Sequence, residues 1–329
     1  MANNLNDHII VHKLAEDLGL KSSAEPVERI LAYCRKKVRE LTQDFDGEMT
    51  PEKMLPWLEG KLSTKFREIH SDADLAQLIS EYCKKKEHIF ATLVQEFQGA
   101  TEGITLRLWH PELWEPQFVS VIDCRGRRRL RRYHTKWHEL THLLVMTDQS
   151  RMEFRRTHDP AQEKSAEEKL VDAVAGDLSF FSDMVEPLID GEISFEKIED
   201  IRTRMCPDAS QTSSAINISK IWPSPCVWIE AKPQAKKSEP KGSSPDLRAV
   251  KISENGPARQ QGLRMIANFR VPPNSIIFGS FFRGFGGGEA IENLAWWKAS
   301  GGTQLQDRLV RVQVKNMGDS VQALVTLVA

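Results

Sequence analysis

Two histidines four residues apart constrain the fold of this chain more than any other feature. In the stretch WHELTHLL, His138 and His142 are separated by three residues that begin with Glu139. On an α-helix this spacing puts both rings on one face, about 6 Å apart at Cβ, so that they can share one metal ion. Residues 127–145 also show helical apolar spacing. The sequence therefore predicts a buried helix that carries part of a metal site.

Glu139 directly follows the first histidine, which favours a catalytic role over a purely structural one. At that position a carboxylate lies beside the metal, where it can take a proton from water instead of binding the ion. Zn²⁺ lowers the pKa of bound water to about 7 and is the metal expected with this pattern. We therefore expect Glu139 to be a general base in a zinc site.

A catalytic zinc site needs a third protein ligand, and a second predicted helix offers carboxylates for it. This helix covers residues 165–189 and contains the run SAEEKLVDAVAGDLSFF, whose acids are Glu167, Glu168, Asp172 and Asp177. Glu168 and Asp172 are four residues apart on a face that is otherwise small and apolar. We expect Glu168 to bind the metal and Asp172 to orient a ligand histidine.

The residues around both helices resemble the ImmA/IrrE-type metallopeptidases. RRRLRRYHTKWHELTH is similar to the family's R-x-R stretch before HExxH, and Glu168 to Ala175 is similar to its E-x-x-A-N-x-F-A helix. The resemblance covers about residues 75–190. It departs at Asp172, where asparagine is usual, and after Gly176, where the family tends to Leu-Met-Pro.

The resemblance implies a zincin-like fold and a bacterial protein that cuts a helix-turn-helix repressor and so switches on a stress or defence operon. It also implies that residues 210–329 correspond to the sensor-like C-terminal domain of some members.

The order of predicted elements favours an α+β protein with a helical, zincin-like domain and a small sheet, followed by a smaller, β-rich α+β domain. We expect a helical region at 1–100 that packs on the peptidase core, the core at 101–207, and a regulatory-like domain at 208–329. Within the core, ITLRLW and FVSVID predict two strands or a hairpin between about 104 and 123.

Five runs beyond Pro207 are rich in β-branched and aromatic residues and predict strands: CVWIEA, LRAVKI, SIIFGSFF, RLVRVQV and QALVTLV. The polar stretch 232–246 predicts a flexible loop, and glycines 284–288 predict a flexible turn.

Composition excludes several classes of protein. A net charge of −1, with 40% hydrophobic and 28% charged residues, is typical of a globular protein and unlike a basic nucleic-acid-binding domain. The chain has no run of 18 apolar residues, and its first ten residues do not resemble a secretion signal. We therefore expect a cytoplasmic protein with no membrane partner.

Six arginines precede the metal helix within eight residues: Arg125, Arg127, Arg128, Arg129, Arg131 and Arg132. They suggest a contact with nucleic acid or an acidic partner. A solvated, arginine-rich helix start is the alternative, and both interpretations stay open.

Cys124 ends the strand FVSVID, fourteen residues before His138. Its thiolate is a candidate inhibitory fourth zinc ligand. A buried, structural thiol is the alternative.

The sequence is compatible with two alternative functions. The first is a zinc endopeptidase acting on a regulatory protein, and the second is a regulatory protein that binds nucleic acid or protein and has a structural zinc. The intact glutamate of the motif favours the first, because a structural site needs no base there.

Overall fold

The computed structural model describes residues 5–109, 111–145, 153–157 (backbone only), 164–235, 245–284, 286–297 and 304–328. Its contacts divide the chain into two units. The N-terminal unit contains Met1–Met184 and Met205–Ser210, and the C-terminal unit contains Val185–Arg204 and Gln211–Ala329.

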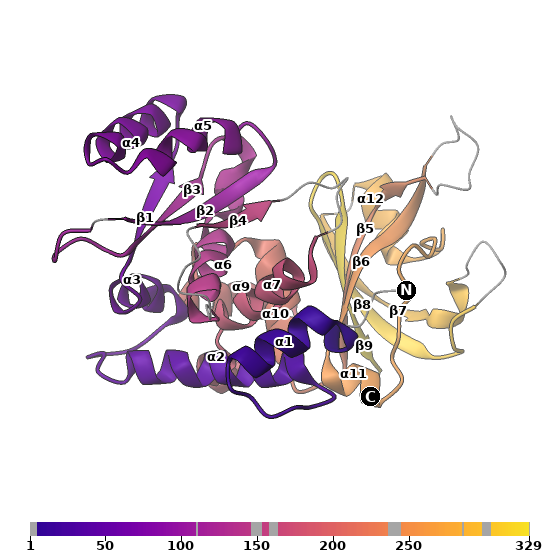
Figure 1. Cartoon of the computed structure of the whole chain (residues 1–329). Coiled ribbons are helices and arrows are strands. Elements are labelled where there is room, and N and C mark those ends of the chain that lie inside the picture. The colour runs from indigo at the N-terminus through magenta and orange to yellow at the C-terminus, as the bar shows by residue number, and fades with distance from the viewer. Residues whose placement is uncertain are drawn as a thin grey trace. The chain divides into compact units, whose positions relative to one another are not determined.

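The N-terminal unit combines helices with four strands (Figure 1). Its elements are η1 (Leu5–Asp7), α1 (Ile9–Asp17), α2 (Pro26–Thr42), α3 (Pro51–Lys61), β1 (Thr64–Ile69), α4 (Asp72–Lys84), η2 (His88–Thr92), α5 (Leu93–Glu96), β2 (Thr101–Arg107), β3 (Phe118–Asp123), η3 (Gly126–Arg131), α6 (Arg132–Leu144), β4 (Glu153–Thr157), α7 (Ala166–Leu178) and α8 (Ser182–Val185).

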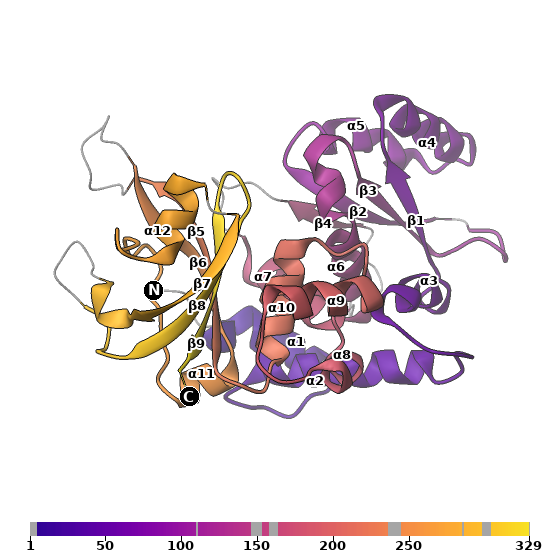
Figure 2. The same cartoon turned by 180° about the vertical axis from the view of Figure 1, so that it is seen from behind.

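The sheet of this unit has the order β1-β3-β2-β4, with β1 parallel to β3 and the other pairs antiparallel. Helices α4 and α5 cover one face, and α6 covers the other (Figures 1 and 2). Because side chains alternate along a strand, Ile104 and Leu106 join the apolar core under α4, whereas Thr105 faces α6. The polar face of the sheet therefore lies against the metal helix.

The predicted hairpin of β2 and β3 is confirmed. The prediction of only helices in the first hundred residues is wrong, because β1 lies within them. Thr50 caps α3 by accepting from the Lys53 amide, and Ser71 caps α4 by accepting from the Asp74 amide. The run TKFREI is short and mostly polar, and it becomes a strand through its pairing with β3, which a local pattern does not reveal.

The C-terminal unit consists of a five-stranded antiparallel sheet with short helices. Its elements are η4 (Glu186–Leu188), α9 (Phe195–Met205), α10 (Gln211–Ile221), β5 (Cys226–Gln234), β6 (Asp246–Glu254), α11 (Gly256–Gln260), α12 (Ile276–Arg283), β7 (Gly287–Asn293), η5 (Leu294–Trp296), β8 (Leu309–Asn316) and β9 (Val321–Leu327). The strand order is β6-β5-β9-β8-β7. The mixture of helices and sheets in both units confirms the predicted α+β class.

Four of the five predicted strands in this unit are present, but SIIFGSFF forms helix α12. Ser275 caps that helix by accepting from the Ile277 amide, and Gly284 ends it with φ +71°. These capping signals outweigh the β-branched composition of the run. The expected glycine turn is also wrong in part, because Gly287 begins β7.

The predicted loop 232–246 is shorter than expected, since β5 extends to Gln234 and β6 begins at Asp246. Residues 236–244 lie outside the described part of the chain. Among the described helices, none is long and apolar enough to cross a membrane.

Candidate metal centre

Helix α6 holds both histidines of the motif on its buried face. It packs against β2, β3 and α7, and Trp137, Leu140 and Leu144 are fully buried within it. His138 and His142 have exposed fractions of 0% and 1%. Their burial restricts the side-chain rotamers and gives the site rigid ligands.

Helix α7 brings Glu168 to the histidines from its first turn. Ser165 caps the helix by accepting a hydrogen bond from the backbone N–H of Glu168 at 3.1 Å. Near the other end, Asp177 accepts two hydrogen bonds from Arg35 on α2. The cap and the ion pair fix the position of α7 relative to its surroundings.

Three potential ligand atoms converge between α6 and α7. The two histidine Nε2 atoms are 3.1 Å apart, and the Glu168 carboxylate lies 3.2 Å from His138 Nε2 and 3.3 Å from His142 Nε2. Tetrahedral zinc with N and O ligands requires about 3.4 Å between ligand atoms. The geometry therefore fits a metal ion such as zinc, and the structure brings together the three residues that the sequence predicts as its ligands.

Asp172 contacts the histidine that the sequence suggested. Its Oδ1 lies 2.9 Å from His138 Nδ1, and its Oδ2 accepts from Lys164. If Nδ1 of His138 donates to Asp172, the Nε2 lone pair faces the other ligand atoms. The Asp172 carboxylate thus fixes both the ring orientation and the tautomer of His138.

Glu139 is fully buried beside the ligands. The Thr105 hydroxyl donates to its Oε2 at 2.7 Å, while Oε1 has no hydrogen-bond partner among the described residues. Burial raises the pKa of Glu139, although His138 and His142 act in the opposite direction. Thr105 therefore holds one oxygen and leaves the other available as a base.

Gly103 leaves the space that the Glu139 carboxylate occupies. A Cβ at this strand position would lie 2.6 Å from Glu139 Oε1 and 2.7 Å from Thr135 Cγ2. Because β2 approaches α6 so closely at this position, only glycine can occupy it.

A chain of buried hydroxyls continues from Thr105 across the sheet. Thr105 Oγ1 lies 2.6 Å from Ser120 Oγ on β3, which lies 3.1 Å from Thr64 Oγ1 on β1. Each hydroxyl has one proton. Because Thr105 donates to Glu139, Ser120 must donate to Thr105, and Thr64 must donate to Ser120. This order fixes the Thr105 hydroxyl toward the glutamate.

Glu168 is the most exposed of the three ligand residues, with 17% of its side chain accessible. Desolvation raises its pKa, but the neighbouring imidazoles of His138 and His142 outweigh that effect and lower the pKa to about 2. It is therefore an anion at neutral pH, as a metal ligand must be.

Cys124 is not among the residues that surround His138. Its Sγ lies 3.9 Å from Glu68 Oε2, in a separate group with His70. Burial and the Glu68 charge raise the pKa of this thiol to about 12, so that it is protonated. The geometry thus supports a structural thiol more than a fourth ligand at the His138 group.

Four of the six arginines form ion pairs within the N-terminal unit. The pairs join Arg125 to Asp72 and Asp123, Arg128 to Asp123, Arg131 to Glu102, and Arg132 to Glu68 and Asp208. Arg127 and Arg129 are exposed, and neither has an ion pair in the described part of the chain. Much of the charge of the cluster is therefore balanced internally.

Sequence reasoning missed the residues that position Glu139: Gly103, Thr105, Ser120 and Thr64. The strand pattern places Thr105 and Ser120 opposite the apolar face, but only the packing of α6 shows what they contact. No protein-family model matches this chain, and no curated protein matches it.

Proposed function

We propose that this protein is a zinc-dependent endopeptidase with a zincin-like N-terminal unit. The observation that carries the proposal is the convergence of His138 Nε2, His142 Nε2 and the two Glu168 carboxylate oxygens, Oε2 beside His138 and Oε1 beside His142, at separations of 3.1 to 3.3 Å. Two histidines and a glutamate, with a fourth position open, are typical of a catalytic zinc site.

The surrounding charges support binding of a cation. Glu168 and Asp172 both lie beside His138, and Glu139 follows it in the chain. Lys164 already contacts Asp172, and a divalent ion would compensate the buried Glu139 and the partly exposed Glu168, whose proximity is otherwise unfavourable.

Each residue then has a defined task. Bound zinc supplies Lewis acidity, which activates water at neutral pH and polarises a carbonyl group. Glu139 Oε1 accepts the proton of the attacking water and delivers it to the leaving amine. Thr105 holds the other oxygen, and Asp172 keeps the proton of His138 on Nδ1.

The resemblance to the ImmA/IrrE-type peptidases supports a regulatory protein as the substrate. We propose a helix-turn-helix repressor, cleaved in the cytoplasm, so that a stress or defence response is switched on. The alternative is a regulatory binding protein with a structural zinc site. It is less well supported, because most of the arginine charge is balanced and a structural site usually has four protein ligands.

The test uses Glu139→Gln, which keeps the shape of the side chain but removes the base. We expect zinc content equal to wild type and a loss of cleavage of at least about 100-fold, measured on a repressor encoded beside this gene. Glu40→Gln, an exposed change on α2, is the control and should cleave normally. Cleavage by Glu139→Gln at the control rate would contradict the mechanism.

A further inference from the structure

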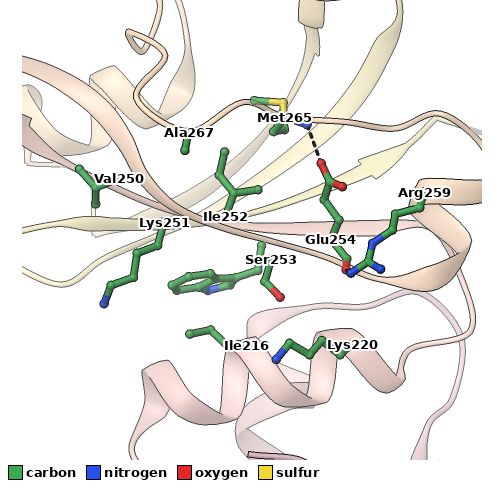
Figure 3. Close-up of a pocket in the computed structure, with 11 residues that line it drawn as sticks. Ile216, Lys220, Val250, Lys251, Ile252, Ser253, Glu254, Arg259, Met265 and Ala267 are labelled. Atoms are coloured by element: carbon green, nitrogen blue, oxygen red, sulfur yellow. Dashed lines mark hydrogen bonds between the residues drawn. The ribbon is translucent and has the colours of Figure 1, made fainter. Parts of the chain in front are cut away.

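The C-terminal unit contains a cavity that the peptidase proposal does not use. It has a volume of about 720 Å³ and lies beside the edge strand β6, between α10 and the segment after α11 (Figure 3). This volume falls within the range of small-ligand sites.

One polar group of this cavity is buried without a partner. Trp228 lines the cavity from β5 and is only 1% exposed, and its indole N–H has no acceptor among the described residues. Burial removes the water that such a donor would otherwise bind, so an unsatisfied indole is unfavourable. A ligand that offers an acceptor atom would satisfy it.

The cavity also carries an excess of positive charge. Lys220, Lys251 and Arg259 contribute cations, and Glu254 is the carboxylate of its lining. One oxygen of Glu254 already accepts from the Met265 backbone N–H at 3.0 Å (Figure 3). Two of the cations, Lys220 and Arg259, are labelled near the same end of the cavity in Figure 3.

Lys251 is only partly neutralised. Its Nζ lies 3.1 Å from Glu230, and Lys232 lies 3.0 Å from the same carboxylate. Two lysines on one glutamate leave a net positive charge beside the cavity. Charge complementarity therefore selects an anion.

Apolar side chains complete the lining on both sides of β6. Ile216 on α10 lies below the strand in Figure 3, and Ile252 and Met265 lie above it. A simple inorganic anion would leave this surface uncovered. An apolar body attached to the anionic group would cover it.

We propose that this cavity binds an organic anion with an apolar or aromatic body. The ligand accepts a hydrogen bond from the Trp228 indole, its charge lies near Lys220 and Arg259, and its body contacts Ile216. This proposal stands independently of the zinc site, because all its residues belong to the C-terminal unit.

The test titrates the full-length protein with 8-anilinonaphthalene-1-sulfonate and with the uncharged N-phenyl-1-naphthylamine, each followed by fluorescence. We expect the anionic probe to bind more tightly. Its Kd should rise about tenfold in Trp228→Phe, which keeps an aromatic ring but lacks the donor, and about fivefold in Arg259→Gln and in Lys220→Gln. Arg283→Gln, at the end of α12, is the matched control.

Unchanged Kd values in Arg259→Gln and Lys220→Gln, or equal affinity for the two probes, would overturn the proposal, even if Trp228→Phe fails to fold. Competition then separates the two sources of such a ligand. Displacement by decanoate indicates an aliphatic carboxylate, and displacement by indole-3-acetate indicates an aromatic one. Displacement by neither compound also overturns the proposal.

Discussion

Among its described residues, the N-terminal unit contains two groups of side chains that could hold a metal ion, and they differ in their surroundings. The first group is His138, His142 and Glu168, and the second is Glu68, His70 and Cys124. In both groups the ligand atoms lie within 4.8 Å of one another. Proximity alone therefore does not distinguish them.

The charges around the two groups differ in where the cations lie. Beside the first group, Lys164 contacts Asp172, and among the described residues no lysine or arginine forms an ion pair with Glu168. In the second group, Lys136 lies 2.5 Å and Arg132 3.4 Å from the Glu68 carboxylate. Two cations already satisfy that carboxylate and oppose a third positive charge. The comparison teaches that the charged neighbours of a ligand cluster decide whether it suits a metal ion.

The largest expected effect is on zinc stoichiometry and stability. Wild type should bind one zinc ion per chain, and zinc at about 100 times its Kd should raise the free energy of unfolding by about 2.7 kcal/mol. The double variant His70→Ala/Cys124→Ser should keep this zinc, whereas His142→Ala should lose it. Metal analysis measures the zinc content of each variant, and denaturant unfolding measures its stability. Loss of zinc from the double variant would show that the second group, and not the first, binds the metal.

The next effect concerns the carboxylate that orients His138. Asp172→Asn should weaken zinc binding by about 10- to 100-fold, as removal of outer partners does. Glu167→Gln changes a carboxylate of the same helix but keeps the contact of Asp172 with His138, so its zinc affinity should equal that of wild type. Competition with a zinc-sensitive dye measures both constants. Equal affinities in the two variants would show that Asp172 has no orienting role.

Gly103→Ala tests the packing of β2 against α6. The added methyl would meet Glu139 Oε1 and Thr135 at under 3 Å, so we expect a loss of about 1–3 kcal/mol in unfolding free energy. In Gly99→Ala the nearest atom to the methyl is 3.8 Å away, and little change is expected. If both variants unfold at the same denaturant concentration, the packing of β2 against α6 does not require glycine at position 103.

The smallest effect is a pH dependence from the second group. Burial raises the pKa of Glu68, but Lys136 and Arg132 outweigh it and bring the pKa below its ordinary value of 4.5. The stabilisation from its charge is therefore present above pH 4.5 and is lost as pH falls through the lower, folded pKa. The stability difference between wild type and Glu68→Gln, about 1 kcal/mol near pH 7, should shrink in acid. A difference independent of pH would exclude an ionic role.

The clustering of the candidate ligands was predictable because their signals are local. The four-residue spacings of His138 with His142 and of Glu168 with Asp172 define helix faces, and the structure brings those faces together. The residues that position Glu139 were not predictable in this way. Gly103 and Thr105 depend on how β2 packs against α6, which no local pattern encodes.

The errors in the predicted fold have the same origin. Strand β1 exists through its pairing with β3, and α12 forms where capping by Ser275 outweighs β-branched composition. Cys124 was considered for the metal because it precedes α6 in sequence. Because β1 and β3 are parallel, the ends of these strands meet, and Cys124 lies beside Glu68 instead.

The most direct test of the metal centre is the zinc content of Glu168→Ala compared with Glu167→Ala, its neighbour in the same helical turn. Both proteins are purified in parallel, checked for folding by circular dichroism, and analysed by mass spectrometry for metal. We predict that Glu167→Ala retains one zinc per chain and that Glu168→Ala loses it. Zinc retained by folded Glu168→Ala at the wild-type level would contradict the three-ligand site.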